Sequence, residues 1–415
     1  MKILQLMMLM TVSTLASGQP NRIDVVLPDA PELAGFGPHA IGVRTLSVSE
    51  PDRVDILNTR ADSEAPRYER TLTVEVWYPA QSEGHQPGTQ YLTSTRNPDI
   101  QATLHGRAMR DAEPAGGERF PLVVISHGYP GNRYLMSHLG ENLASKGYVV
   151  ASIDHSDSTY DDQHAFASTL YNRPLDQRQT LSALDQFSRQ PDHFLHALLD
   201  AGNSALIGYS MGGYGVLNNL GAGFSDTGID FIGSPPNRLL YQHGADNPDY
   251  AGSLDSRFKV GIAIAPWGMN MGFWDAAGLG SLNVPLLIVA GDADATSGYE
   301  QGVRAVYEHA GSAERRMLVF RNAGHSIAAP IPLPVEFLDR GDVAGASHYL
   351  DPVWDARRAN NILQHFATAF LDLHLKADSS RSAWLDVAED GSASGEAHWK
   401  GFAEHTAVGL RMYRK

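Results

Sequence analysis

The sequence contains a serine between two glycines, in the pattern that holds a nucleophile at a sharp turn. The pentapeptide Gly208-Tyr209-Ser210-Met211-Gly212 follows an apolar run and precedes a glycine-rich helix start. In this strand–turn–helix setting the glycines let the backbone pass close to its neighbours, and the first N–H groups of the helix face developing negative charge. Because a serine hydroxyl needs a base at neutral pH, the expected chemistry is acyl transfer by Ser210 with the help of a histidine.

The base and the acid are expected after two later strands. His325 directly follows the last parallel strand, and among 17 histidines it is selected because the chain order serine, acid, histidine suits this architecture. The acid should follow the apolar strand Pro285–Ala290, where the sequence Gly-Asp-Ala-Asp offers Asp292 and Asp294. We prefer Asp294 because the G-x-x-D step carries its carboxylate past the end of the strand, and Asp292 remains the alternative.

Two backbone N–H groups are predicted to stabilise the oxyanion of the reaction. One belongs to Met211, the residue after the nucleophile, and the other to Tyr129 in the loop His127-Gly128-Tyr129-Pro130-Gly131. Pro130 has no N–H to donate, and His127 is expected to brace the loop. Tyr129 and Trp267 are candidates for lining an apolar acyl pocket, although ordinary packing would explain Trp267 equally well.

The elements that must position these residues alternate between short apolar strands and helices. Continuous apolar strands of this kind indicate a parallel sheet covered on both faces, and Thr71–Tyr78, which alternates polar and apolar residues, suits an antiparallel edge strand. The sequence therefore predicts an α/β-hydrolase fold with a mostly parallel central sheet, helices on both faces and lid-like insertions. The expected strands are Phe120–Ser126, Tyr148–Ile153, Ser204–Tyr209, Val260–Ala265, Pro285–Ala290 and Met317–Phe320, and the expected helices are Met136–Lys146, Leu181–Leu199, the segment after Ser210, and Trp354–Leu375.

The predicted domain organisation has four parts. Residues 1–18 form a signal peptide, 19–70 an N-terminal extension, 71–376 the catalytic domain and 377–415 a tail of weak periodicity with no readable role. Insertions are expected around residues 155–178, 221–259 and 327–353. Long segments on the side where strands end usually shape a ligand site, so these insertions are expected to border the pocket.

The signal peptide is predicted from the order of residues at the N-terminus. Met1-Lys2 supplies positive charge, Ile3–Val12 is almost entirely apolar but too short to span a membrane, and Ala16-Ser17-Gly18 offers small residues for cleavage. No later apolar run is long enough for a membrane span. The protein is therefore expected to be secreted or periplasmic.

Composition excludes several other classes of function. The chain has no cysteine, which rules out disulfides, a thiol nucleophile and thiolate metal sites. Its formal net charge of −15 argues against nucleic acid and anionic membrane surfaces as partners. The expected partner is a small-molecule or lipid-like ester, and the predicted chemistry implies no metal and no organic cofactor.

Taken together, the motifs around Tyr129, Ser210, Trp267, Asp294 and His325 resemble the α/β-hydrolase superfamily. Within it, the chain looks most like the dienelactone-hydrolase-like group that includes the platelet-activating-factor acetylhydrolases, and it is similar to bacterial cutinase-like polyester hydrolases in the same segments, about 120–325. The resemblance implies cleavage of esters with short or oxidised acyl chains. The chain departs from the dienelactone hydrolases in lacking their cysteine nucleophile, and from the compact cutinases in its extra segments.

The function expected from the sequence is hydrolysis of carboxylic esters through an acyl-enzyme formed on Ser210. A phospholipid or short-acyl acetylhydrolase, a lipase-type enzyme and a polyester hydrolase are the alternatives that keep the same chemistry. A peptidase or amidase would use the same residues, because a triad activates any acyl carbonyl. A non-catalytic binding module is the remaining possibility, and it would have no need for the complete set.

Overall fold

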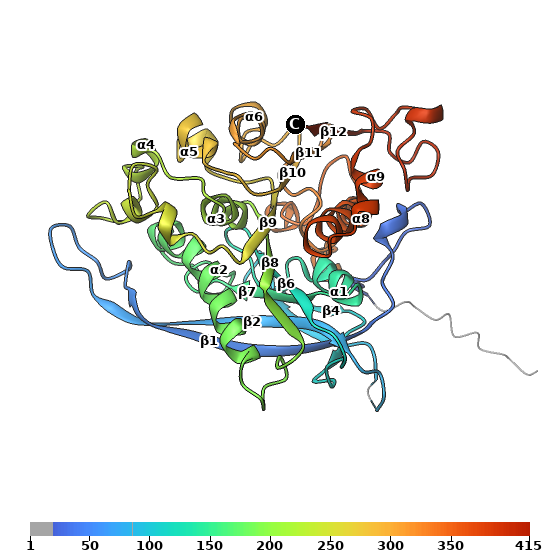
Figure 1. Cartoon of the computed structure of the whole chain (residues 1–415), viewed down its shortest axis with the longest axis horizontal. Coiled ribbons are helices and arrows are strands. Elements are labelled where there is room, and N and C mark those ends of the chain that lie inside the picture. The colour runs from blue at the N-terminus through green and yellow to red at the C-terminus, as the bar shows by residue number, and fades with distance from the viewer. Residues whose placement is uncertain (1–19, 85) are drawn as a thin grey trace, which may run out of the picture.

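A ten-stranded sheet runs through the centre of the molecule, and the computed structural model describes residues 20–84 and 86–415 of the chain (Figure 1). The strand order is β12-β11-β10-β9-β8-β6-β7-β2-β1-β5, and a separate hairpin is formed by β3 and β4. The strands are β1 (Ala40–Val54), β2 (Arg67–Ala80), β3 (Gln90–Ser94), β4 (Gln101–His105), β5 (Met109–Arg110), β6 (Phe120–Ser126), β7 (Val149–Asp154), β8 (Leu199–Tyr209), β9 (Phe258–Ile264), β10 (Leu286–Gly291), β11 (Arg315–Phe320) and β12 (Leu410–Arg414).

The middle of the sheet is parallel and is flanked by antiparallel pairs on both sides, with the short outermost strand β5 parallel to β1. All neighbouring pairs from β7 through β6, β8, β9 and β10 to β11 are parallel, whereas β2 pairs antiparallel with both β1 and β7, and β12 pairs antiparallel with β11. All residues of β6 and β10 are buried, as expected for strands covered on both faces. The predicted fold class is thereby confirmed.

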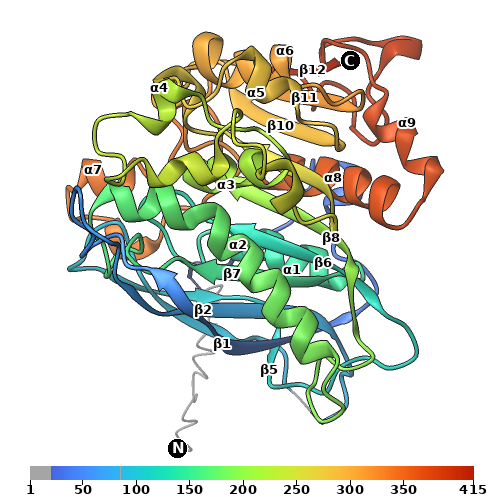
Figure 2. The same cartoon turned by 60° about the vertical axis from the view of Figure 1, so that its left-hand side comes forward.

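Helices cover both faces of the sheet, as the two views in Figures 1 and 2 show. On one face Val123 and Ile125 of β6 share a hydrophobic cluster with residues of α1 and α8, and on the other face Leu122 and Val124 share a cluster with residues of α2 and α3. Alternate side chains of one strand thus pack into two different hydrophobic cores, one on each face of the sheet. The helices are α1 (Ser137–Ser145), α2 (Phe166–Ser188), α3 (Met211–Asn219), α4 (Asp226–Ile229), α5 (Ala276–Gly280), α6 (Ala305–His309), α7 (Val343–Ala346), α8 (Ala356–Leu375) and α9 (Ser382–Leu385).

The structure corrects two of the predicted elements. The stretch Thr71–Tyr78 lies within β2 but is not at the edge of the sheet, because β1 pairs with all eight of its residues and β7 lies on its other side. The helix predicted at Leu181–Leu199 is instead α2, which ends at Ser188, and Leu199 already begins β8. The first half of α2 buries polar side chains and contains Pro174, so it lacks the apolar periodicity by which a helix is recognised.

The expected boundaries at residues 71 and 376 do not coincide with the ends of the sheet. Strand β1 comes from the segment predicted as an N-terminal extension, and β12 comes from the tail, where it pairs with β11 from Arg316↔Arg414 to Phe320↔Leu410. Half of the insertion expected at 155–178 is α2 itself. The predicted signal peptide lies outside the described residues, and no described helix has both the length and the apolar character needed to cross a bilayer.

Candidate active site

Ser210 lies on a strained turn between the end of β8 and the start of α3. Its backbone has φ 53° and ψ −113°, a conformation that non-glycine residues rarely adopt. Its N–H donates to the carbonyl of Ile264 at 2.9 Å, and its own carbonyl accepts from Tyr214 at 3.0 Å, so the turn is held from both sides. The side chain is thereby presented where the parallel strands end.

The glycines on either side of Ser210 are required by close packing of backbones. A Cβ on Gly208 would lie 2.2 Å from the carbonyl carbon and oxygen of Gly212, and a Cβ on Gly212 would lie 1.9 Å from the carbonyl oxygen of Ser126. Neither distance is compatible with a side chain unless the backbone moves. The glycines of the pentapeptide therefore allow the turn to pack against β6.

His325 reaches Ser210 from the loop that follows β11. Its Nε2 lies 2.9 Å from the Oγ of Ser210, within hydrogen-bonding distance. The imidazole packs at a tilt on the ring of Tyr209, with 5.3 Å between ring centroids. The structure thus brings together a hydroxyl and an imidazole that are 115 positions apart in the chain.

Asp294, and not Asp292, completes this chain of hydrogen bonds. The Oδ2 of Asp294 lies 2.8 Å from the Nδ1 of His325, and its Oδ1 accepts the N–H groups of Thr296 and Ser297 at 2.8 and 3.0 Å. Asp294 is 3% exposed. Asp292 is exposed and accepts the N–H of Asn322 in the turn.

The loop after β6 lies against Ser210, as the predicted oxyanion hole requires. A Cβ placed on Gly128 would lie 3.4 Å from the Cβ of Ser210. Met211 is the first residue of α3, and the first N–H groups of a helix have no acceptor within the helix. His127 is buried and contacts the Gly128 carbonyl through Nδ1 at 2.6 Å, while its Nε2 accepts the N–H of His155. It therefore braces the loop and does not face Ser210 as a second base.

A pocket of about 430 Å³ opens at Ser210 and His325. Tyr129 lines it, but Trp267 does not, because the Trp267 ring packs against Phe166 and Phe273 with 5.4 Å between centroids in both pairs. One wall comes from the predicted insertion 327–353, and Arg96 comes from the turn between β3 and β4. The lining residues are Arg96, Tyr129, Tyr209, Ser210, Thr296, Gly324, His325, Ser326, Ala344, Ser347, His348, Leu350, Asp351 and Pro352.

Sequence reasoning missed Arg96 and His348 in this wall. His348 Nε2 lies 2.7 Å from the hydroxyl of Tyr160, which ties the segment 327–353 to the loop after β7. Burial, and to a smaller extent the positive charge of Arg96, lower the pKa of His348 to about 3. The sequence indicated only that the segment 327–353 follows the end of a strand and should border the pocket. It did not indicate which residues of that segment line the pocket.

A second hydroxyl–imidazole–carboxylate chain lies beneath the oxyanion loop. Ser126 Oγ is 2.8 Å from His155 Nε2, and His155 Nδ1 is 2.9 Å from the Oδ2 of Asp176. All three side chains are at most 1% exposed, and burial lowers the pKa of His155 to about 3. Because no substrate reaches Ser126, this chain is part of the scaffold, and the accessible serine is Ser210.

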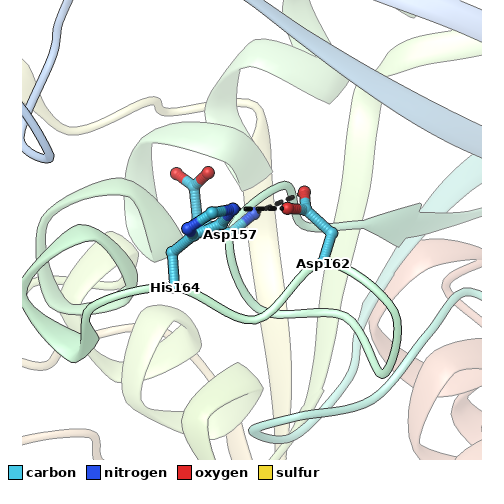
Figure 3. Close-up of side chains that lie close together, drawn as sticks. All are labelled: Asp157, Asp162 and His164. Carbon is cyan, nitrogen blue, oxygen red and sulfur yellow. Dashed lines mark hydrogen bonds and ion pairs between the residues drawn. The ribbon is translucent and has the colours of Figure 1, made fainter. Parts of the chain in front are cut away.

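One group of side chains in the described part of the chain has the spacing of a metal site, namely Asp157, Asp162 and His164 (Figure 3). Each of them already has a protein partner. His164 Nε2 pairs with Asp162 at 2.9 Å, and Asp157 Oδ2 accepts from Arg70 at 2.9 Å and from Ser168 at 2.6 Å. None of the three lines the pocket at Ser210. The group therefore has no role in the arrangement described above.

Comparison with known proteins agrees with this fold. A model of the family "Platelet-activating factor acetylhydrolase, isoform II" matches residues 37–187, which include the loop after β6 and most of α2 but end before Ser210. In the solved structure of a ferulic acid esterase from Streptomyces cinnamoneus, the fold is similar with a TM-score of 0.58 at 22% identity, covering 84% of this chain and 94% of the other. The chain thus has the fold of the α/β-hydrolases. The matches also confirm the predicted resemblance to the acetylhydrolase-like group.

Curated relatives of the chain include cutinases and platelet-activating factor acetylhydrolases. Cutinase est1 from Thermobifida alba is 27% identical over 213 residues, which cover 51% of this chain and 55% of the relative. The platelet-activating factor acetylhydrolase from Cavia porcellus is 23% identical over 289 residues, which cover 66% of this chain and 62% of the relative. The chain thus spans little more than half the length of these relatives.

Proposed function

We propose that the chain is a serine esterase that hydrolyses carboxylic esters through an acyl-enzyme intermediate. The observation that carries the proposal is the continuous hydrogen-bonded chain from Ser210 through His325 to the buried carboxylate of Asp294, at the wall of a pocket. The relatives named as cutinases and acetylhydrolases support the same class of reaction.

Each residue of the site has a defined task in the proposed reaction. Ser210 Oγ attacks the ester carbonyl while His325 Nε2 accepts its proton, and the N–H groups of Met211 and Tyr129 stabilise the negative charge on the carbonyl oxygen. His325 then protonates the leaving alcohol. Asp294 holds the imidazole in the tautomer with hydrogen on Nδ1 and stabilises its protonated form. Water, activated by His325, releases the acid, so the reaction needs no metal or organic cofactor.

Short-acyl esters are the substrate class that we favour. The family model supports a relation to the acetylhydrolases, and a pocket of about 430 Å³ is of the size that holds a small ligand. Cutinase-like cleavage of polyesters is the second candidate, supported by the relatives named as cutinases. We also propose that the chain is exported, on the N-terminal residue order alone.

Covalent labelling is the experiment that tests the proposed function. A fluorophosphonate should attach to Ser210 of the intact protein, identified by mass spectrometry of the modified peptide, and labelling should abolish hydrolysis of p-nitrophenyl acetate. Ser210→Ala should show neither reaction. A protein that turns over esters while the label sits on another serine would overturn the assignment, and a protein that does neither would favour a binding module.

The charges of the pocket wall predict selectivity for the acyl chain. The oxygens of Asp351 already accept the N–H groups of Gly324, Val353 and Trp354, whereas the exposed Arg96 leaves a positive charge at the wall. We expect Arg96→Gln to lower kcat/KM for mono-p-nitrophenyl glutarate about 5-fold, the size of one partly solvated charge pair, and to leave p-nitrophenyl valerate unchanged. Arg96→Lys should retain the preference, and an equal loss on both esters would contradict this role.

A further inference from the structure

Helix α2 turns a polar face toward the core of the molecule, directly behind the oxyanion loop. Arg173, Asp176 and Gln177 are three and four positions apart and therefore share one face of the helix. Their side chains are at most 1% exposed. Buried polar groups are costly unless they are hydrogen-bonded, so the partners of this face show what it holds in place.

Arg173 is bound to the loop after β6. Its Nη1 donates to the carbonyl of His127, and its Nη2 donates to the hydroxyl of Ser158 at 2.7 Å and approaches the carbonyl of Gly128 at 3.4 Å. Burial lowers the pKa of Arg173 to about 9, so the guanidinium remains protonated at neutral pH. A buried cation whose hydrogen bonds go to loop carbonyls and a hydroxyl is an anchor for that loop.

The anchored carbonyl and the predicted oxyanion donor belong to the same peptide group. In a planar trans peptide the C=O of Gly128 and the N–H of Tyr129 point in opposite directions. The carbonyl of Gly128 faces two donors, His127 Nδ1 at 2.6 Å and Arg173 Nη2 at 3.4 Å. Fixing this carbonyl on the side of α2 therefore directs the Tyr129 N–H to the opposite side.

His127 is itself held in the tautomer that this arrangement needs. Burial, followed by the charge of Arg173, lowers the pKa of His127 well below its usual value, so the ring is neutral. Its Nε2 accepts the N–H of His155, which leaves the hydrogen on Nδ1 for the Gly128 carbonyl. His155 is in turn oriented by Asp176 of α2.

The same face of α2 also contacts the other half of the oxyanion hole. Gln177 Nε2 donates at 3.0 Å to the carbonyl of Gly212, the residue after Met211, in the first turn of α3. Gln177 Oε1 accepts from Asn219 at the end of α3, so the side chain is fixed at both ends. One face of α2 thus holds both segments that carry the proposed donors.

We infer that Arg173 is a positioning residue for the oxyanion hole, which holds the peptide between Gly128 and Tyr129 with the Tyr129 N–H directed toward the carbonyl oxygen of the substrate. The inference rests on the proposed function and goes beyond the triad, since Arg173 touches neither Ser210 nor the substrate. Helix α2 thereby helps to stabilise the transition state, because it holds the loop after β6 in place.

Arg173→Met tests this role, because methionine fills much of the space of arginine but donates no hydrogen bond. Removal of one oxyanion donor typically lowers kcat by about 10²- to 10³-fold, so a misaligned donor should lower kcat for p-nitrophenyl acetate by about 10- to 100-fold. KM should stay within about 2-fold, because the loss falls on the transition state. Affinity for a trifluoromethyl ketone, which forms an oxyanion on Ser210, should fall by the same factor as kcat.

Two further variants separate positioning from general stability. Asn172→Ala removes a neighbouring buried side chain of α2 that contacts Ser168 and Arg53 but not the loop, and it should leave kcat within about 3-fold. Arg173→Lys retains a buried cation and one donor and should recover part of the loss. Thermal unfolding of all variants shows whether a loss of kcat comes from a destabilised fold.

Crystal structures of wild type and Arg173→Met keep the test independent of the proposed function. If the wild-type protein hydrolyses no ester, the proposed function fails, and the orientation of the 128–129 peptide alone then decides the inference. The carbonyl of Gly128 should rotate away from its wild-type direction when the guanidinium is lost. An unchanged peptide, or a folded Arg173→Met protein with wild-type kcat, would overturn the inference.

Discussion

Asp294→Asn is expected to lower kcat for p-nitrophenyl acetate about 10⁴-fold, the size of the effect when a triad acid is neutralised. The side chain keeps its shape, but its amide no longer stabilises the protonated imidazole and favours the wrong tautomer of His325. The carboxylate also accepts two backbone N–H groups, so the asparagine oxygen should turn toward them and present its NH₂ to His325. Stopped-flow or steady-state release of p-nitrophenolate measures the loss.

Asp292→Asn is the matched control for this prediction. Asp292 lies two positions earlier, is exposed and contacts the N–H of Asn322, which an asparagine oxygen can still accept. Its kcat should therefore remain within about 3-fold of wild type. A large loss in Asp292→Asn together with an active Asp294→Asn protein would exchange the roles of the two carboxylates.

Mild acid is expected to unfold the protein. Burial is the main cause that lowers the pKa values of five described histidines from the ordinary 6.5 to about 3 or 4: His138, His155, His243, His348 and His365. Between these values the unfolded chain binds protons that the folded chain does not, so the free energy of unfolding falls as pH falls. Each histidine contributes about 1.4 kcal/mol per pH unit.

The summed effect is large compared with the stability of a typical domain, about 5–15 kcal/mol. We therefore expect the fold to be lost between about pH 6 and pH 4, although Glu141 and Asp154, whose pKa values burial raises, act in the opposite direction. Urea unfolding followed by tryptophan fluorescence at several pH values measures the slope. A free energy of unfolding that is constant from pH 6.5 to pH 5 would contradict the prediction.

His138→Gln and His405→Gln test the origin of this slope. His138 is buried and contacts the carbonyl of Ala329 at 2.9 Å, whereas the side chain of His405 is 78% exposed. Replacing His138 should flatten the pH dependence by about 1.4 kcal/mol per pH unit, and replacing His405 should leave it unchanged. Equal slopes in both variants would assign the acid sensitivity to other groups.

The parts of the fold that could be predicted are those in which the local pattern of apolar residues matches the burial of these residues in the folded protein. Strand β6 has the predicted bounds, Phe120–Ser126, because every residue in it is buried and the apolar run shows this directly. Ser210, Asp294 and His325 follow β8, β10 and β11, and parallel strands necessarily end at one edge of the sheet. The order of strands and loops therefore places these three residues close together.

The parts that could not be predicted depend on contacts between distant segments. The buried face of α2 carries Arg173, Asp176 and Gln177, residue types that a pattern of apolar positions assigns to the surface. Strand β12 carries two arginines in five residues and becomes part of the sheet only through pairing with β11. Arg96 reaches the pocket because a hairpin from the N-terminal region packs beside it, and no local signal indicates that position.

The closeness of main-chain segments around Ser210 has a consequence for how a site of this kind can diversify. A side chain at Gly208 would meet Gly212, and one at Gly212 would meet Ser126, so any replacement at either glycine demands a concerted shift of two or three segments. Ser210 is under no comparable steric limit, since exchanging its oxygen for sulfur adds no atom. In this scaffold the side-chain atom at position 210 is therefore more readily exchanged than the glycines beside it, and the glycine pattern can persist while that atom changes.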